Sequence, residues 1–361
     1  MRIVDHTIYR YRLPYARAVK WSDIVEDGAD FLLLRLTADT GNEGVAETVL
    51  KPTWNGASAS TMTAALEDVL LPWLKDQDVS DPAGVAARLA MIPGQQAACT
   101  LLDNALWDLR AASARTPLWH YLGGRDTVDL SWVLTRQAPS LMVQEAEDVI
   151  ARHGFRAVKI KGGQGLDVDV QAVREIRKAV GDDVALYVDA NGAYPLHAAQ
   201  SYVDAMTDAG AALVEDPSPL HPDAAFESLQ ASLASPVLVD FGNTCLRDTA
   251  LFLERGARAI SLKPGRFGLT ATRQMATLAA AHDALTVVGM FGESALGTLT
   301  ALAQAACLPD SALPAETTWY LAMTTQIVDL PAVREGRLRL PAACGLAQQV
   351  DWDRLTSLTR S

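Results

Sequence analysis

The residues that could do chemistry in this chain of 361 residues are polar side chains that end a series of short apolar segments. They are Lys159, Lys161, Asp189, Asn191, Glu215, Asp240, Lys263 and Glu293. From Lys161 onward, the charged positions follow one another at intervals of 23 to 30 residues, about the length of one strand and one helix. If each follows a successive strand of one parallel sheet, all of them point into one pocket at the C-terminal ends of the strands.

Three members of this series are carboxylates, namely Asp189, Glu215 and Asp240. Carboxylates that are buried together repel one another and raise one another's pKa, and a divalent cation removes that cost. A set of oxygen ligands without His or Cys suits Mg²⁺, with Mn²⁺ or Ca²⁺ as rival ions. The alternative is that each carboxylate caps the helix that follows it.

Lysines flank these carboxylates in the sequence. Lys159 and Lys161 are two positions apart on a predicted strand and face the same side, where neighbouring ammonium groups lower each other's pKa and favour a base near neutral pH. Lys263 is expected across the pocket, so that a proton could leave one face of a substrate carbon and return on the other. The alternatives are a surface pair for Lys159 and Lys161 and a structural ion pair for Lys263. Glu293 could hydrogen-bond a substrate or a lysine, or cap a helix that begins near Ser294.

The elements that must position these residues alternate from about residue 128 onward. Short apolar strands are each followed by an amphipathic helix, which is typical of a parallel sheet with right-handed crossovers. The expected strands are VDLSWVLT, FRAVKIKG, VALYVDANG, AALVEDP, PVLVDFGN, AISLKPG and LTVVGMFG. This number of strands favours a barrel over an open doubly wound sheet, which would usually carry a glycine-rich turn after its first strand.

The start and the end of the chain have a different pattern. Residues 1–50 are predicted to form an antiparallel meander, and helical periodicity follows to about residue 125. We therefore predict an α+β domain over residues 1–125, with residues 326–361 packing back on it, and a catalytic domain over residues 126–325.

Composition restricts the partners of the chain. It has 43 acidic and 31 basic residues and a net charge of −12, which argues against nucleic-acid binding because that needs a basic face. No apolar run is long enough for a membrane span or a signal peptide. The four separated cysteines without a CxxC pair indicate reduced thiols. We expect a cytoplasmic protein that acts on a small molecule, with neither a nucleic acid nor a membrane as partner.

The chain resembles the enolase superfamily, and within it the muconate-lactonizing-enzyme subgroup, over essentially its whole length. Besides Asp240 after PVLV, the segments that carry the resemblance are AVKIKGG (157–163), VDANGAY (188–194), LVEDPSP (213–219), LKPGRFG (262–268) and GMFGESALGTL (289–299). The resemblance implies an α/β fold in which an N-terminal α+β capping domain covers a modified TIM barrel, (β/α)7β. It implies Mg²⁺ ligands and acid/base lysines at matching positions, with Lys159 tuning Lys161: the ligands are Asp189, Glu215 and Asp240, and the lysines are Lys161 and Lys263.

The resemblance also implies the type of reaction. We expect a Mg²⁺-dependent isomerase that removes the alpha proton of a small carboxylate substrate to give a metal-stabilised enediolate. It would be a racemase or epimerase of an amino-acid derivative, or a cycloisomerase. The alternatives are a lyase that uses the same enediolate, as in o-succinylbenzoate synthesis or hydroxy-acid dehydration, and a metal-binding scaffold without catalysis. Members of the family are often dimers or octamers, so a homo-oligomer is expected.

Two capping loops, residues 15–31 and 50–57, are expected to set specificity by closing over a substrate that is apolar at one end and polar at the other. Their two tryptophans could instead pack at the domain interface. The predicted substrate-binding residues in the whole chain are Glu293, Asn191, Lys20, Trp21 and Trp54.

The chain departs from the subgroup pattern at two positions near the end of expected strands. Phe241 stands where an acidic residue often pairs with the second lysine, which leaves the charge of Lys263 open. Gly292 resembles an insertion before Glu293. The resemblance implies that a dipeptide epimerase would carry an Asp-x-Asp pair at this strand. This chain has only Glu293 and Ser294 there, which disfavours a dipeptide substrate.

Overall fold

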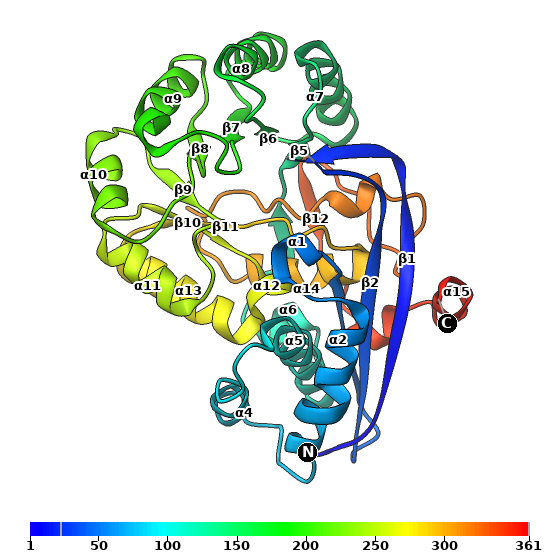
Figure 1. Cartoon of the computed structure of the whole chain (residues 1–361). Helices are drawn as coiled ribbons and strands as arrows, with labels where there is room; N and C mark the ends of the chain where they lie inside the picture. The colour runs from blue at the N-terminus through cyan, green and yellow to red at the C-terminus, as the bar shows by residue number, and fades with distance from the viewer. Residues whose placement is uncertain (22–23, 360–361) are drawn as a thin grey trace.

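A computed structural model describes residues 1–21 and 24–359 of the chain, apart from the side chains of Trp21 and Asn55. The chain begins with an antiparallel sheet in the order β1-β2-β3, formed by β1 (Ile3–Trp21), β2 (Ile24–Ala38) and β3 (Glu43–Val49). β1 and β2 form a hairpin that runs along one side of the molecule, drawn in blue in Figure 1. Residues 15–31 therefore lie largely in the two strands of this hairpin rather than in the expected loop.

Helices follow this sheet. They are α1 (Pro52–Asn55), α2 (Ala59–Ala64), a π-helical segment (Ala65–Leu70), α3 (Leu71–Leu74), α4 (Pro82–Leu89), α5 (Gln96–Ser113) and α6 (Leu118–Tyr121). We call β1–β3 and α1–α6 the capping region. α5 packs closely on β3 at Gly44, where a Cβ atom would lie 2.5 Å from the carbonyl oxygen of Ala105. No helix in the described part of the chain is long and apolar enough to cross a membrane.

The second part of the chain is a parallel sheet with helices outside it. Its strands neighbour one another in chain order: β5 (Trp132–Leu134), β6 (Ala157–Lys161), β7 (Ala185–Asp189), β8 (Leu213–Glu215), β9 (Val237–Val239), β10 (Ala259–Leu262) and β11 (Leu285–Val288). The helices are α7 (Pro139–His153), α8 (Leu166–Val180), α9 (Leu196–Asp208), α10 (Ala224–Ser232), α11 (Leu246–Glu254), α12 (Pro264–Phe267), α13 (Leu269–Ala281) and α14 (Ala295–Ala305). Figure 1 shows α7 to α13 arranged around the strands, as the barrel prediction requires.

An eighth segment, residues 313–316, closes this barrel, and no strand was predicted there. On one side, Leu313 and Glu316 donate backbone N–H groups to β11 with N···O distances of 2.9 Å. On the other side, Ala315 exchanges two backbone hydrogen bonds of 2.8 and 2.9 Å with residues 129–131. The segment reads Leu-Pro-Ala-Glu, so it is too short to show the apolar pattern of a strand. The sheet is the modified TIM barrel that we predicted, closed by this segment.

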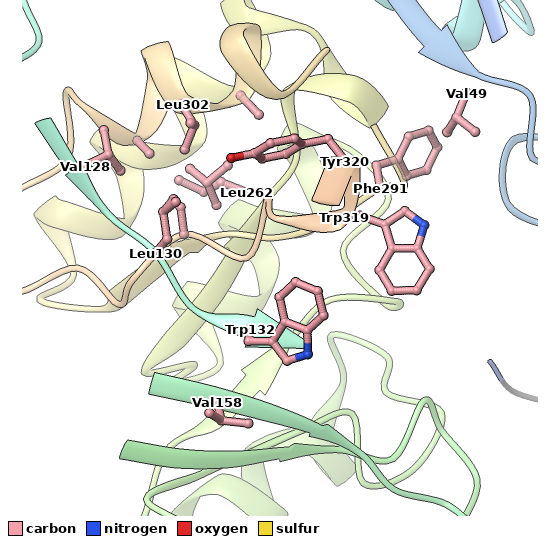
Figure 2. Packing of buried hydrophobic residues seen from close by; sticks show 14 of the residues in the cluster. Val49, Val128, Leu130, Trp132, Val158, Leu262, Phe291, Leu302, Trp319 and Tyr320 are labelled. Carbon is pink, nitrogen blue, oxygen red and sulfur yellow. The ribbon is translucent and has the colours of Figure 1, made fainter. Parts of the chain in front are cut away.

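The apolar core is continuous between the barrel and the capping region. One cluster of buried side chains includes Val158 of β6 and Leu262 of β10 together with Val49 of β3. Figure 2 shows part of this cluster, with Phe291 and Trp319 on the side nearest to Val49. The two parts therefore share apolar contacts as well as the polar contacts described below.

The C-terminal segment contacts both parts of the molecule. Its elements are a 3₁₀ turn (Trp319–Ala322), β12 (Arg337–Arg339), a second 3₁₀ turn (Leu346–Gln349) and α15 (Trp352–Leu358). β12 pairs antiparallel with β4 (Thr127–Asp129), which precedes the barrel strands, whereas Thr359 forms a bridge with Tyr11 of β1. In Figure 1 α15 lies beside β1. The division of the chain at residues 125/126 and 325/326 stays a prediction.

One buried carboxylate joins the capping region to the C-terminal segment. Asp108 of α5 has no exposed surface and accepts backbone N–H groups from Val45 and Leu346 at 2.9 and 2.8 Å. Burial raises the pKa of Asp108 to about 7. The pKa of an unfolded Asp is about 3.9, so the folded state holds this proton more tightly. The stability that the group contributes is complete below about pH 4 and is lost as the pH rises through about 7.

We predict that the Asp108→Asn variant removes this pH dependence. Relative to the variant, the wild-type protein should lose up to about 4 kcal/mol of unfolding free energy between pH 4 and pH 8, since each unit of pKa difference corresponds to about 1.4 kcal/mol. Thermal and urea unfolding of both proteins across this pH range measures the difference in unfolding free energy between them. The contributions of other titrating groups are the same in both proteins and cancel in this difference. A difference that is the same at every pH would contradict the prediction.

Candidate active site

The ends of the barrel strands bring the predicted lysines and carboxylates together. In the strand ladders Lys161 is the partner of Asp189, and Asp189 is the partner of Glu215. These three side chains are buried, as are those of Asp240 and Lys263. The spacing of the series along the chain therefore corresponds to neighbouring positions at one end of the barrel.

Lys159 lies among carboxylates at the centre of this group. Its Nζ is 2.6 Å from Glu215 Oε2, 3.0 Å from Glu316 Oε2 and 3.1 Å from Asp189 Oδ2. Burial by itself lowers the pKa of Lys159, but the three carboxylates raise the pKa well above its usual value. The expectation that neighbouring ammonium groups lower each other's pKa does not hold for Lys159, because negative charges outnumber positive ones around it.

Glu316 belongs to this group of buried charges and was not among the predicted site residues. It lies in the closing segment of the barrel, is 1% exposed, and accepts a hydrogen bond of 3.0 Å from the hydroxyl of Tyr187. A (β/α)7β barrel needs an eighth strand after its last helix. A search for a charged residue in that short segment would have found Glu316.

Lys161 and Asn191 both contact Asp189. Lys161 Nζ lies 2.5 Å from Asp189 Oδ2. The backbone N–H of Asn191 donates to Asp189 Oδ1 at 2.8 Å, and Asn191 Nδ2 donates to Oδ2 at 3.1 Å. Asn191 thus orients a predicted metal ligand, and a contact between Asn191 and a substrate stays a prediction.

Lys263 lies on the opposite side of the barrel mouth from Lys161. Lys161 ends β6 and Lys263 follows β10, which is four strands away in a barrel of seven strands and one closing segment. Lys263 forms an ion pair with Asp240, and its Nζ lies 4.9 Å from the ring centroid of Trp54. Asp240 therefore supplies the negative partner that Phe241 cannot, and the Phe241 ring packs edge-on against Trp54 with centroids 5.7 Å apart.

A cluster of carboxylate oxygens could hold a divalent cation. Ligand atoms of Glu215, Asp216 and Asp240 all lie within 4.8 Å of one another. Oε1 of Glu215 and Oδ1 of Asp240 are buried without a hydrogen-bond partner, which fits a cation between them. The sequence predicts Asp189 in this set, and Asp216 was not predicted.

The sequence and the geometry point to different residues as the third carboxylate of that cation site. The sequence predicts Asp189, whereas Asp216 lies within the oxygen cluster. Both oxygens of Asp216 accept backbone N–H groups, from Asp240 at 3.2 Å and Phe241 at 2.7 Å. Asp189 Oδ2 lies instead against the ammonium groups of Lys159 and Lys161. A bound cation would compete with these ammonium groups for Asp189. We therefore retain Asp189 as a predicted ligand and interpret Asp216 as the residue that orients Asp240.

Glu293 is buried between the barrel and the capping region. Its Oε2 accepts the backbone N–H of Phe291 at 2.9 Å, and burial raises its pKa to about 7. Ser294, rather than Glu293, caps α14 through its own side chain. Glu47 of β3 accepts the Ser294 N–H at 2.8 Å and its hydroxyl at 2.6 Å. The capping region thus fixes the loop that carries Glu293.

α5 holds the segment that follows Lys263. Asn104 Nδ2 donates to the carbonyl oxygen of Pro264 at 3.0 Å, and Asn104 Oδ1 accepts the N–H of Leu269 at 2.8 Å. One helical turn away, the hydroxyl of Thr100 donates to the carbonyl oxygen of Arg266 at 3.1 Å. The capping region therefore positions one of the two predicted acid/base lysines through the backbone.

We predict that Asn104→Ala lowers both stability and the activity that depends on Lys263. The change leaves a buried carbonyl and a buried N–H unpaired, which should cost about 2 to 4 kcal/mol. Asn104→Asp keeps the acceptor for Leu269 but buries a carboxylate oxygen against the carbonyl oxygen of Pro264, so it should lose stability as well. Thermal unfolding of the three proteins measures these losses, and an unchanged midpoint in Asn104→Ala would contradict the prediction.

A cavity lies between the barrel mouth and the capping region. Its lining comes from both parts and comprises Tyr15, Val19, Glu26, Lys51, Trp54, Val133, Thr135, Lys161, Met290, Phe291, Gly292 and Trp319. The cavity has a volume of about 40 Å³. Most of the lining is apolar, and Lys161 reaches it from the barrel.

The predicted specificity residues are distributed unevenly around this cavity. Trp54 lines it and also packs on Phe291, with ring centroids 5.4 Å apart; a contact between Trp54 and a substrate stays a prediction. Lys20 is exposed on the hairpin and is not among the lining residues. The side chain of Trp21 lies outside the described residues. Lys51, within the expected loop 50–57, takes a place in the cavity that we had not assigned.

Comparison with known proteins identifies both parts of the chain. The N-terminal domain model of mandelate racemase and muconate lactonizing enzyme matches residues 6–123, and the enolase C-terminal domain-like model matches residues 141–354. The chain is 27% identical over 359 residues to a chloromuconate cycloisomerase of Cupriavidus necator, covering 97% of this chain and 96% of the relative. It is 29% identical over 333 residues to an o-succinylbenzoate synthase of Geobacillus kaustophilus, covering 89% and 86%.

The fold also matches solved structures. The L-Ala-D/L-Glu epimerase of Bacillus subtilis, solved with its substrate, superposes with a TM-score of 0.89 at 25% identity, covering 96% of this chain and 98% of that one. The similar proteins thus include a cycloisomerase, a synthase and an epimerase. With both domain models matched and the barrel mouth described above, this chain belongs to the muconate-lactonizing-enzyme subgroup of the enolase superfamily.

Proposed function

We propose that this protein is an isomerase that removes the alpha proton of a small carboxylate substrate, either a racemase or epimerase of an amino-acid derivative or a cycloisomerase. The observation that carries the proposal is the placement of Lys161 and Lys263 on opposite sides of one barrel mouth. A lysine on each face of a carbon can take a proton from one side and deliver one from the other. The alternative is a lyase, which the similarity to an o-succinylbenzoate synthase supports.

Each residue of the site has a proposed task. Lys161 and Lys263 exchange protons with the substrate carbon, and Lys159 holds the carboxylates around it in place. Asp189, Glu215 and Asp240 would hold Mg²⁺, or Mn²⁺ in its place, because all three offer oxygen ligands. When bound, that ion supplies positive charge beside the substrate carboxylate, where negative charge develops as the proton leaves. Asn191 orients Asp189, and both Asn191 and Glu293 remain proposed substrate-binding residues.

Deuterium exchange tests this reaction. The protein is incubated in heavy water with Mg²⁺ and separate sets of N-acyl amino acids, dipeptides, proline derivatives, muconates and hydroxy acids, and each compound is followed by mass spectrometry. Incorporation of deuterium at the alpha carbon of one set supports the proposal. Loss of water from the exchanged compound would identify the lyase instead, and absence of exchange in all sets would reject both.

Two further proposals concern the protein in the cell. We propose a cytoplasmic location and a homo-oligomer, either a dimer or an octamer, with a small carboxylate as the partner. Light scattering behind a sizing column measures the oligomeric state directly. A monomer at micromolar concentration would reject the assembly without affecting the proposed reaction.

A further inference from the structure

The cavity that Lys161 reaches from the barrel also contains a lysine from the capping region. Lys51 follows β3, is 7% exposed, and forms an ion pair with Glu26 of β2. We propose that Lys51 binds a second oxygen group of the substrate, a carboxylate or a carbonyl remote from the reacting carboxylate. This inference rests on the proposed function, because it assumes that the reacting carbon lies beside Lys161.

The burial of Lys51 favours a binding task. Lysines are rarely buried, and removing an ammonium group from water costs several kcal/mol even when a carboxylate accompanies it. Burial also lowers the pKa of Lys51, whereas Glu26 opposes that shift. A buried ammonium group attracts a ligand oxygen more strongly than an exposed one does, because water screens it less. It also has three N–H donors and can exchange partners when a ligand enters.

The barrel contains a matching feature at Gly292. Its φ is +97°, and a Cβ atom there would lie 3.4 Å from Cε of Lys51. A side chain at this position would strain the backbone, and its Cβ would touch the lysine stem at an ordinary van der Waals distance. The glycine that looked like an insertion before Glu293 thus lies against Lys51, which links two features of this chain that lie far apart in the sequence.

The rest of the cavity restricts the middle of the substrate. Aromatic rings of Tyr15, Trp54, Phe291 and Trp319 line it together with aliphatic side chains. A substrate that fits has a carboxylate at the barrel end, an apolar body between the rings and an oxygen acceptor at Lys51. A compound without that acceptor would gain no interaction with the ammonium group, and it would bind more weakly.

Matched acids of equal length test the proposal on the full chain with Mg²⁺. The probes are hexanoate, monomethyl adipate and adipate, and the corresponding compounds of eight carbons. Calorimetry should show about 10- to 100-fold tighter binding of the probes with a distal oxygen group at one length or both, since hydrogen bonds to charged groups contribute about 1.5 to 3 kcal/mol. A preference for the diacid over the ester identifies a carboxylate, and equal binding identifies a carbonyl. Equal binding of all probes overturns the proposal.

Variants identify the lysine responsible. Lys51→Met should reduce the advantage of the distal oxygen group to within about threefold, whereas Lys75→Met, which removes an exposed lysine of the capping region, should preserve it. If Lys51→Met fails to fold, Lys51→Met with Glu26→Gln removes the charge of both partners. Retention of the full preference in the Lys51 variants overturns the proposal. Because the readout is binding, a protein that keeps the preference but exchanges no alpha proton would reject the proposed reaction and retain this binding site.

Discussion

Replacing Lys161 by arginine is expected to lower alpha-proton exchange about 10²- to 10⁴-fold for the substrate enantiomer whose proton faces it, the range that a positioned acid or base contributes. Arginine keeps the positive charge that pairs with Asp189, so the buried carboxylate retains its partner. It cannot act as a base near neutral pH, because its pKa exceeds 12. The exchange rate of each enantiomer in heavy water, followed by NMR, measures the loss.

Lys263→Arg is the matched variant on the opposite side of the barrel mouth. It keeps the ion pair with Asp240 and should slow the other enantiomer by a similar factor. Exchange that each variant retains for the opposite enantiomer shows that the folded site is intact. If both variants slowed the same enantiomer equally, or neither slowed any, the assignment of one lysine to each face would be wrong.

Loss of one of the proposed metal-binding carboxylates should be nearly as damaging. In Glu215→Gln and Asp189→Asn, we expect Mg²⁺ to bind at least about 100-fold more weakly, because neutral amides replace anionic ligands at a hard cation. Isothermal titration with Mg²⁺ measures the affinity without a substrate. Activity should decline in parallel, since fewer molecules hold the ion at a given concentration.

Asp216→Asn separates the two possible ligand sets. Asp216 lies within the oxygen cluster, but its oxygens accept backbone N–H groups of the segment that carries Asp240. Its loss should weaken Mg²⁺ binding less than the loss of Asp189, by at most about tenfold, as expected for a residue that orients a ligand. A larger loss in Asp216→Asn than in Asp189→Asn would place Asp216 in the ligand set and remove Asp189 from it.

The sequence was most informative at charged residues on predicted strands, because a buried strand normally carries apolar side chains. A carboxylate or lysine at the end of a buried strand needs a reason to be there, and the repeat length of a strand and a helix relates such residues around a barrel. Lys161, Asp189 and Glu215 were found in this way and are neighbours in the ladders. Glu316 was missed because the closing segment is too short to show a strand pattern.

Features that depend on contacts between the two parts were less predictable. The hairpin of β1 and β2 extends through most of the expected loop, because strand pairing continues beyond the apolar segments that signalled it. Lys20 and Lys51 are both lysines of the capping region, and composition cannot distinguish the exposed one from the one in the cavity. Their different positions follow from packing against the barrel.

The sequence alone therefore determined the barrel, the family and the chemical groups at the barrel mouth, because strand-and-helix periodicity and local motifs are properties of neighbouring residues. Only the tertiary structure decided which carboxylate accompanies each lysine, that Asp216 belongs to the oxygen cluster with Asp240, and that Lys51 and Gly292 line one cavity. These relations join residues up to 241 positions apart in the chain. A local sequence pattern cannot reveal contacts between residues so far apart in the chain. The packing of the capping region on the barrel determines these contacts.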